Sequence, residues 1–211
     1  MRFVAIDPDK ISTIHLASDF PNFSDVSSSE QRLSNKFFVY VGQRSGYKNF
    51  TSLLRALADS AFMRDGFKLV VFGGGRFTDS EIQLMKELSL TGKIVKCDGS
   101  DEELFKIYSQ ATALLYPSIM EGFGIPILEA MASGCPVICG NLSSLPEVAG
   151  DAPTYFDPTS VSSISAAIDE TLSDAAYLTS MISRGMSQSK KFSWQKTAEE
   201  TKKLYLRTLG R

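Results

Sequence analysis

Two glutamates, Glu121 and Glu129, lie eight positions apart in the stretch EGFGIPILE. Between them, Gly122 and Gly124 leave the backbone free to point N–H groups inward, and Pro126 suits the first position of a helix, where its missing N–H is no loss. A helix N-terminus binds anions, and carboxylates accept hydrogen bonds from sugar hydroxyls. The spacing predicts a cradle for a ligand with phosphate in its middle and a sugar at each end, which describes a nucleotide sugar.

One of the two acids also has a simpler interpretation. Taken alone, Glu129 reads as an ordinary acidic residue near a helix start, where the helix dipole favours negative charge. The hypothesis of a ligand site therefore depends on cations that lie close to the same cradle.

Two cations follow the first expected core strand, in the loop GQRSGYKN at residues 42–49. Gly42 allows a tight exit from the strand. Arg44 can grip a phosphate through two parallel N–H bonds, and Lys48 adds a mobile positive charge near the start of the next helix. A solvated loop with two surface charges remains the alternative interpretation of this stretch.

A glycine run, GGGRF at residues 73–77, follows the second expected strand. Gly73 and Gly74 would let a ligand approach the backbone closely, although a flexible turn explains them equally well. The run is not the dinucleotide fingerprint, which should follow the first strand. A nicotinamide- or flavin-dependent oxidoreductase is therefore disfavoured.

Short apolar runs alternate with helical patterns from residue 37 onward, which predicts a parallel, doubly wound α/β sheet of the Rossmann type. Expected strands cover residues 37–42, 68–73, 93–97, 113–117, 136–140 and 153–157. Expected helices cover residues 49–61, 79–90, 101–111 and 125–133. Capping-box spacing marks two of the helix starts, Thr78 with Glu81 and Ser100 with Glu103.

Both ends of the chain differ from this core. Residues 1–36 are expected to be an inter-domain segment and linker, with one strand-like piece at 11–17 and a Ser-rich loop at 24–31. Residues 37–174 form the expected Rossmann-like domain. Residues 175–211 read as a C-terminal helical extension.

Composition sets limits on the partners. The 211 residues carry a formal charge of −2, which gives no electrostatic case for binding nucleic acid or an anionic membrane. No apolar run approaches the roughly 20 residues of a transmembrane helix. Cys97, Cys135 and Cys139 are too few, with one His, for a structural zinc site. We expect a reduced, cytoplasmic setting with no metal.

The stretches EGFGIPILEAMASGCPVI and SSLPEVAGDAPTYFDP resemble the C-terminal, donor-binding domain of a family-4-type GT-B retaining glycosyltransferase. The family's Glu-x7-Glu motif falls on Glu121 and Glu129. Its Gly-Arg-x(n)-Lys-Asn element, in which the gap before Lys varies, corresponds to Gly42, Arg44, Lys48 and Asn49. The resemblance covers residues 37–158 and implies one half of a GT-B fold.

The resemblance implies transfer of a hexose from a UDP- or GDP-type sugar to a glycan or lipid, with retention at the anomeric carbon and with neither metal nor cofactor. Arg44, Lys48 and Glu121 would be catalytic. The nucleotide base would lie near Lys96 and Leu104. The expected donor-binding residues are Gly42, Arg44, Lys48, Gly73, Gly74, Lys96, Leu104, Glu121, Gly122, Phe123, Gly124, Ile125 and Glu129.

An acceptor-binding domain and a catalytic His region of the family have no counterpart in this chain. His15 is not expected to substitute, because it precedes the core. The last helix is expected to pack on that N-terminal domain, through which any contact with the inner membrane would also be made. A non-catalytic sugar-nucleotide-binding or interaction module of the same fold is the alternative function.

Overall fold

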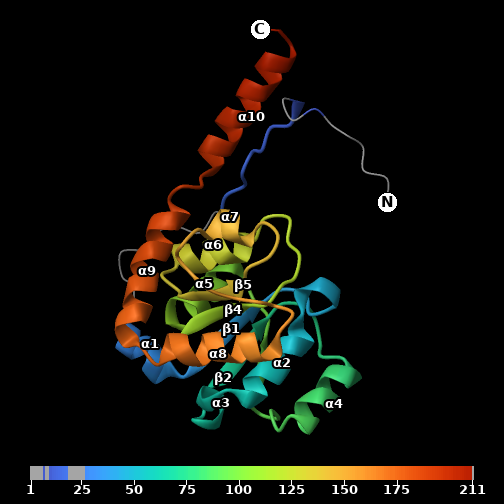
Figure 1. The fold of residues 1–211 in the computed structure, drawn as a ribbon, viewed down its shortest axis with the longest axis vertical. Coiled ribbons are helices and arrows are strands. Elements are labelled where there is room, and N and C mark those ends of the chain that lie inside the picture. Colours follow the sequence, from blue (N-terminus) through green and yellow to red (C-terminus); the bar gives the residue numbers. More distant parts are fainter. Residues whose placement is uncertain (1–6, 8–9, 19–26, 211) are drawn as a thin grey trace.

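The computed structural model describes residue 7, residues 10–18 and residues 27–210. Its centre is a six-stranded parallel sheet with the strand order β3-β2-β1-β4-β5-β6, covered by helices on both faces (Figure 1). The predicted Rossmann-like, doubly wound α/β fold is confirmed.

All six expected strands are present. They are β1 (Phe37–Val41), β2 (Lys68–Phe72), β3 (Ile94–Cys97), β4 (Ala113–Tyr116), β5 (Val137–Gly140) and β6 (Thr154–Phe156). The helices are α1 (Ser29–Asn35), η2 (Gly46–Lys48, a 3₁₀ turn), α2 (Phe50–Asp59), α3 (Ala61–Arg64), α4 (Asp79–Glu87), α5 (Asp101–Gln110), α6 (Ile125–Ala132), α7 (Leu145–Ala149), α8 (Val161–Leu172), α9 (Ala175–Ser189) and α10 (Trp194–Thr208). Both predicted capping boxes form, at the starts of α4 and α5.

The core has two layers because successive strand side chains point to opposite faces of the sheet. In β1, Phe38 and Tyr40 pack with the apolar sides of α2 and α8. Val39 and Val41 face the other way and pack with α5 and α6. Burial on both faces explains why these strands read as continuous apolar runs.

The strand order reverses between β1 and β4, and ligands of such sheets bind at this switch point, outside the carboxyl ends of the strands. β1 and β4 are paired only at Phe38 with Ala113 and at Val39 with Leu114. Beyond these pairs, β1 continues to Val41 and β4 continues to Tyr116 without further pairing between the two strands. The loops that follow them are therefore free to form the walls of a site.

The Ser-rich segment before β1 is helical where a loop was expected. That prediction is wrong for residues 29–31, which begin α1, whereas residues 24–26 lie outside the described residues. Ser28 caps the helix by accepting a hydrogen bond from the Gln31 N–H at 3.2 Å. Buried Arg32 donates to the carbonyls of Tyr108 (3.0 Å) and Ala111 (2.7 Å) at the end of α5. A cation at a helix C-terminus satisfies its orphan carbonyls, so α1 is part of the domain.

The two ends of the chain run side by side away from the sheet (Figure 1). Residues 11–17 are extended but pair with no strand, so the strand-like prediction there is wrong. Two hydrogen bonds connect them to α10: the Thr197 hydroxyl donates to the His15 carbonyl at 2.6 Å, and Arg207 donates to the Ser12 hydroxyl at 2.8 Å.

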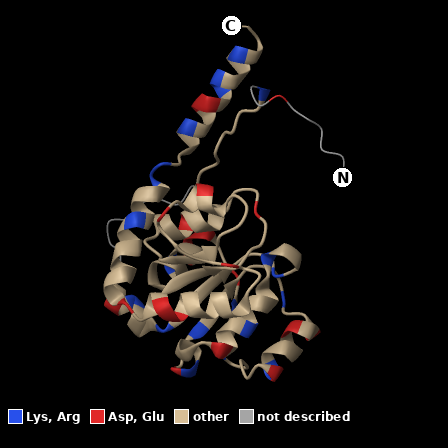
Figure 2. Ribbon diagram, viewed as in Figure 1, with Lys and Arg blue, Asp and Glu red and all other residues tan. Residues whose placement is uncertain are grey.

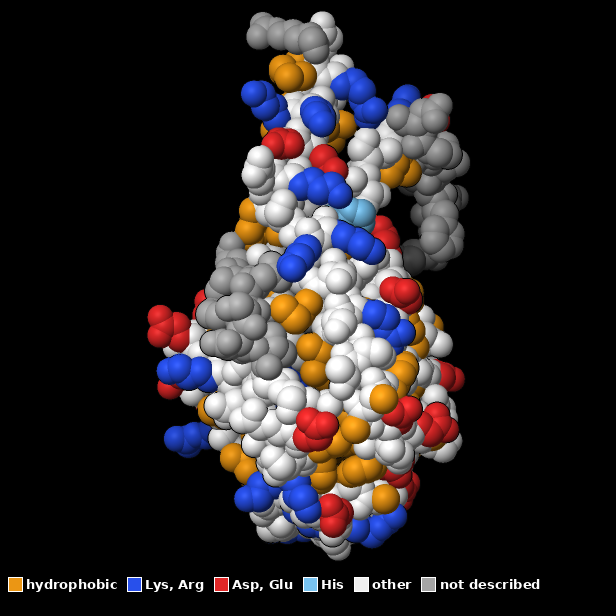
Figure 3. All heavy atoms as spheres, turned by 90° about the vertical axis from the view of Figure 1, so that its left-hand side faces the viewer, with side chains coloured by type: hydrophobic (Ala, Val, Ile, Leu, Met, Phe, Trp, Pro, Cys, Tyr) orange, Lys and Arg blue, Asp and Glu red, His pale blue; other side chains and the backbone are white. Residues whose placement is uncertain are grey.

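No residue of α10 is buried, and Trp194, Tyr205 and Leu206 are exposed along it. Basic and acidic residues also lie along the same helix (Figure 2), which Figure 3 shows as a column standing off the body. The predicted contact of this helix with another domain stays a prediction. Among the described residues, no helix is both long and apolar enough to cross a bilayer.

Candidate functional site

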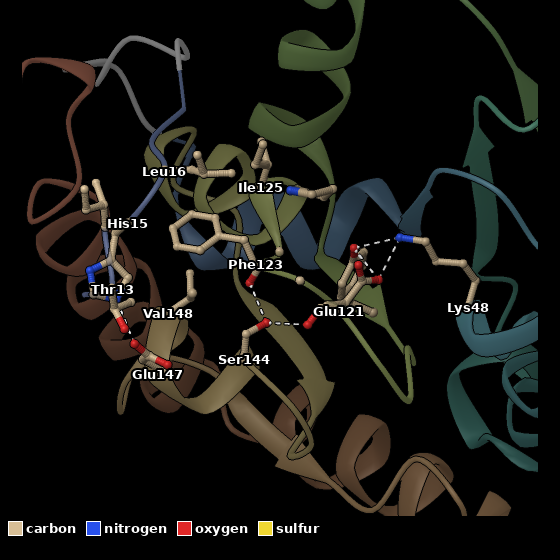
Figure 4. A pocket seen from close by; sticks show the side chains of 15 residues that line it. Thr13, His15, Leu16, Lys48, Glu121, Phe123, Ile125, Ser144, Glu147 and Val148 are labelled. Carbon is tan, nitrogen blue, oxygen red and sulfur yellow. Dashed lines mark hydrogen bonds and ion pairs between the residues drawn. The ribbon is translucent and has the colours of Figure 1, made fainter. Parts of the chain in front are cut away.

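A cavity of about 600 Å³ opens at the carboxyl edge of the sheet, next to the switch point. Its walls come from four parts of the chain: the loops after β1 and β4, the start of α6, the start of α7, and residues 13–16 of the N-terminal segment (Figure 4). The predicted site residues that line it are Lys48, Glu121, Gly122, Phe123, Gly124 and Ile125.

Three polar groups meet at one side of this cavity. The Lys48 Nζ lies 2.7 Å from Glu121 Oε1 and 3.1 Å from the Tyr116 hydroxyl, which donates to the same Glu121 oxygen at 2.9 Å. The side chains of Lys48 and Glu121 are only 14% and 10% exposed. Burial, together with the Glu121 carboxylate, raises the pKa of Tyr116 well above its usual value. Tyr116 therefore stays a neutral donor at physiological pH.

The glycine-rich loop between β4 and α6 is held by serines that precede α7. The Ser143 hydroxyl accepts from the Glu121 N–H at 2.9 Å, and the Ser144 hydroxyl donates to the carbonyls of Glu121 (2.9 Å) and Phe123 (3.1 Å) (Figure 4). Gly124 has φ +107°, and a Cβ there would come within 3.0 Å of Leu145. This position therefore requires glycine.

The helix that follows begins at residue 125 as predicted, but Pro126 does not take its expected first position. Gly124 is the N-cap of α6 and Ile125 its first residue, so Pro126 occupies the second position. The missing N–H of Pro126 is still one of the four that lack an intrahelical acceptor. The first turn of α6 thus points toward the cavity, as the sequence predicts.

Arg44 does not line the cavity. Its Nε donates to Glu81 Oε1 at 2.8 Å, and its terminal nitrogens donate to the carbonyls of Gly73 (3.3 Å), Gly75 (3.3 Å) and Arg76 (2.7 Å). The guanidinium also lies 4.8 Å from the centre of the Phe77 ring. Its side chain is 4% exposed.

Glu81 is the partner that sequence reasoning missed. Burial pushes its pKa up, but the hydrogen bonds from Arg44 and Thr78 outweigh this and hold the pKa below its usual value. One carboxylate therefore completes the capping box of α4 and pairs with Arg44. The capping-box spacing marked Glu81, but it gave no sign of the pairing with Arg44.

The predicted glycines after β1 and β2 contact each other. A Cβ on Gly74 would lie 2.6 Å from the Gly42 carbonyl oxygen and 2.7 Å from Arg44 Nη1. Gly73 donates its N–H to the Cys97 carbonyl at 3.0 Å and has φ +77°. The small size of these glycines lets the loops after β1 and β2 pack closely together. None of Gly42, Gly73 and Gly74 lines the cavity.

Glu129 lies in the second turn of α6 and faces α5, not the cavity. Its Oε2 accepts a hydrogen bond from the Tyr108 hydroxyl at 3.3 Å. Burial raises the pKa of Glu129 to about 7, while the hydrogen bond from Tyr108 acts in the opposite direction. Its carboxyl group is therefore poised to titrate near neutral pH.

The residues predicted to lie near a nucleotide base are placed apart from the cavity. Lys96 pairs with Asp98 and donates to the Cys97 carbonyl at 2.9 Å. Leu104, on α5, is 6% exposed and packs in the core. Their roles as base contacts stay predictions.

Sequence reasoning left out one wall of the cavity. His15 lines it, with its Nε2 2.8 Å from Glu147 Oε1 and its ring 6.0 Å from Phe123 and 5.6 Å from Phe192. Figure 4 shows His15 and Glu147 together at the end of the cavity opposite Lys48. The stretch SSLPEVAG, quoted for its resemblance, contained Glu147 but did not indicate a partner in the N-terminal segment.

The cavity can hold a ligand that is both anionic and rich in hydroxyls. It offers the ammonium group of Lys48, the carboxylates of Glu121 and Glu147, the imidazole of His15, the neutral phenol of Tyr116 and the start of a helix. Within the described part of the chain, no three His, Cys, Asp or Glu residues gather as a metal site would require.

Known proteins are similar to this chain in sequence. The family model for group 1 glycosyl transferases matches residues 24–188. O-antigen chain mannosyltransferase B of Escherichia coli is 37% identical over 174 residues, which make up 80% of this chain and 45% of that protein. O-antigen chain mannosyltransferase RfbU of Salmonella typhimurium is 33% identical over 174 residues, or 81% of this chain and 47% of that protein. The chain spans about half the length of these curated relatives.

Solved structures share the fold. A crystal structure of a glycosyltransferase from Rickettsia africae superimposes with a TM-score of 0.81 at 18% identity, covering 97% of this chain and 59% of that one. At this identity the likeness establishes the fold alone, one half of the two-domain GT-B architecture. Together with the family match over most of the chain, it shows that this protein belongs to the group 1 glycosyltransferases.

Proposed function

We propose that this chain is the donor-binding half of a hexosyltransferase that uses a nucleotide-diphosphate sugar of the UDP or GDP type. The transfer would go to a glycan or lipid acceptor, with retention at the anomeric carbon and without a metal ion. The acceptor would be bound by a second domain that precedes this one in full-length relatives.

The observation that supports this proposal best is the pairing of Lys48 with Glu121 near the N-terminus of α6. A cation and a hydrogen-bond-accepting carboxylate lie 2.7 Å apart in one cavity, at the point of the fold where nucleotides bind. A diphosphate needs the first group and a hexose needs the second. A volume of about 600 Å³ is in the range of small-molecule sites.

In this proposal Lys48 neutralises the negative charge that develops on the departing diphosphate. A fixed cation in a site shielded from water stabilises such charge by a few kcal/mol without reorganising during the reaction. The N–H groups of Gly122, Phe123 and Gly124 would orient the phosphate and the hexose. Glu121 would accept hydrogen bonds from the hexose hydroxyls. Glu129 would accept them from the ribose, which requires its side chain to turn from Tyr108 toward the cavity.

Arg44 has a different role in the proposal from the one the sequence indicates. Its donors are already engaged by Glu81 and by three carbonyls, so Arg44 supports the loop that follows β2. In this proposal Arg44 contributes less than Lys48 to ligand binding. A direct contact of Arg44 with phosphate would require it to leave Glu81.

Mannose is the first sugar to test, because the relatives named above are mannosyltransferases. Isothermal titration would compare GDP-mannose, UDP-glucose and ADP-glucose, each with its free nucleoside diphosphate and its bare nucleoside. We expect one base to bind best, its diphosphate to bind much more tightly than its nucleoside, and excess EDTA to change nothing. Equal, undetectable heats for every nucleotide would contradict the proposal.

In this proposal, transfer requires an acceptor-binding domain in addition to this one. Adding such a domain from a full-length relative, in cis or as a separate polypeptide, should give transfer or slow donor hydrolysis. Donor binding without either reaction in that complete form would favour the non-catalytic binding module instead.

A further inference from the structure

Lys48 and Glu121 are each other's partner in this structure, although the proposed function assigns them to different parts of the donor. Lys48 can approach a diphosphate fully only by releasing Glu121. The Glu121 side chain is 10% exposed, and a poorly solvated carboxylate that loses its cation is costly unless another donor holds it. Donor binding therefore demands an exchange of partners within this cluster.

Tyr116 is the one side chain that contacts both members of the pair among the described residues. Its hydroxyl accepts from Lys48 at 3.1 Å and donates to Glu121 Oε1 at 2.9 Å. Its backbone lies in β4, paired with Cys139 of β5, and the residue is 1% exposed. The phenol is thus fixed by the sheet.

Lys48 and Glu121 are attached less rigidly. Lys48 ends the short 3₁₀ turn η2, and Glu121 lies in the glycine-containing loop before α6. When these two elements adjust to a ligand, we expect the phenol of Tyr116 to keep its position, because the residue is buried and its backbone is paired with Cys139 of β5.

We propose that Tyr116 is a positioning residue, which holds the Glu121 carboxylate toward the hexose once Lys48 turns to the diphosphate. This inference rests on the proposed function of the same cavity. Because the phenol is a neutral donor, it can bind Glu121 without competing for the anionic phosphate as a second cation would. Its contribution should therefore concern the sugar part of the donor and not the nucleotide part.

The test compares two ligands in the wild-type chain and in Tyr116→Phe, which keeps the ring and removes only the hydroxyl. Titrations with a nucleotide sugar and with the matching free nucleoside diphosphate give the affinity that the sugar adds. We expect Tyr116→Phe to weaken nucleotide-sugar binding about tenfold or more, as for a lost hydrogen bond to a charged group, and to change diphosphate binding less than threefold.

Tyr155→Phe is the matched control. Its hydroxyl donates to the Gly150 carbonyl at 2.6 Å, on β6 and away from the cavity, so the variant loses a tyrosine hydrogen bond of similar kind. Both ligands should bind Tyr155→Phe as they bind the wild type. Equal weakening of both ligands by Tyr116→Phe, or no weakening of either, would overturn the inference.

A second comparison, with a double mutant, still tests the inference if Tyr116→Phe by itself destabilises the fold. In a Glu121→Gln background the charged acceptor is gone, so adding Tyr116→Phe should reduce sugar affinity far less than it does in the wild type. Fully additive losses would show that Tyr116 does not act through Glu121. If the wild-type chain gains no affinity from the sugar at all, the proposed function fails before the role of Tyr116 comes into question.

Discussion

Two cations of one loop, Arg44 and Lys48, end in contrasting surroundings. Both pair with a glutamate at 2.7–2.8 Å, and both pairs are largely shielded from water. Arg44 points away from the cavity and also donates to three backbone carbonyls, so all its nitrogens are engaged. Lys48 lines the cavity and shares its carboxylate with a phenol.

The contrast teaches how to separate a structural ion pair from a functional one. A pair whose groups also satisfy backbone carbonyls cannot open without leaving buried acceptors unpaired, which is expensive. A pair that borders a cavity can exchange one partner for a ligand. By this criterion Arg44 with Glu81 maintains the fold, and Lys48 with Glu121 is available for binding.

The largest effect expected from this comparison is on stability. Arg44→Ala should lower the free energy of unfolding by about 3–5 kcal/mol, because it leaves the Glu81 carboxylate and several carbonyls without donors. Urea unfolding measures the change. Arg55→Ala, at an exposed position of α2, is the control and should stay within about 0.5 kcal/mol of the wild type. A fully stable Arg44→Ala that fails to bind nucleotide would reverse the assignment.

Lys48→Met should affect binding more than stability. Losing a charge-assisted contact should weaken nucleoside-diphosphate binding by about 1.5–3 kcal/mol, whereas binding of the bare nucleoside should hardly change. Titration calorimetry with both ligands measures the difference. Lys106→Met, on the exposed side of α5, is the matched control. The comparison breaks if Lys48→Met unfolds as readily as Arg44→Ala while its ligand affinity is preserved.

Glu129 provides a pH-dependent prediction. Its pKa is raised from the ordinary glutamate value of 4.5 to about 7 in the folded chain, mainly by burial. Between these values the folded state keeps a proton that the unfolded state has released, so this group makes stability fall as pH rises from about 4.5 to 7. Urea unfolding of Glu129→Gln should show a shallower decline over that window. Parallel curves for variant and wild type would contradict the raised pKa.

The smallest effect is expected at the far end of the cavity. His15 and Glu147 form a pair whose side chains are 33% and 59% exposed, and exposed pairs contribute about 1 kcal/mol or less. A double-mutant cycle with His15→Gln and Glu147→Gln, followed by thermal unfolding, should give a small coupling energy. A coupling as large as that between Arg44 and Glu81 would place His15 among the residues that maintain the fold.

Local patterns predicted the secondary structure well where the signal itself is local. The strands are short apolar runs because both of their faces are covered, and the capping boxes need only a spacing of three residues. The segment of α1 escaped prediction because a serine-rich stretch lacks helical periodicity. Its helix depends on Arg32 reaching carbonyls about 76 residues away in the chain.

Some parts of the candidate site could likewise be predicted from local sequence, and other parts could not. The loop after β4 and the start of α6 were predictable, since glycine and proline restrict the backbone at their own positions. Glu129 was expected to face the same cavity as Glu121. It faces Tyr108 instead, because the second turn of α6 packs on α5.

The sequence alone determined the parallel α/β fold, through the period of its apolar residues, and its motifs resemble those of glycosyltransferases. Anion binding by the loops after β1 and β4 stays a prediction from the same motifs. Only the tertiary structure decided that Lys48 borders the cavity, that Arg44 is closed off by Glu81, and that His15 completes a wall. Each of these contacts joins segments that are distant in the chain and come together at one edge of the sheet. Local residue preferences do not predict contacts of this kind.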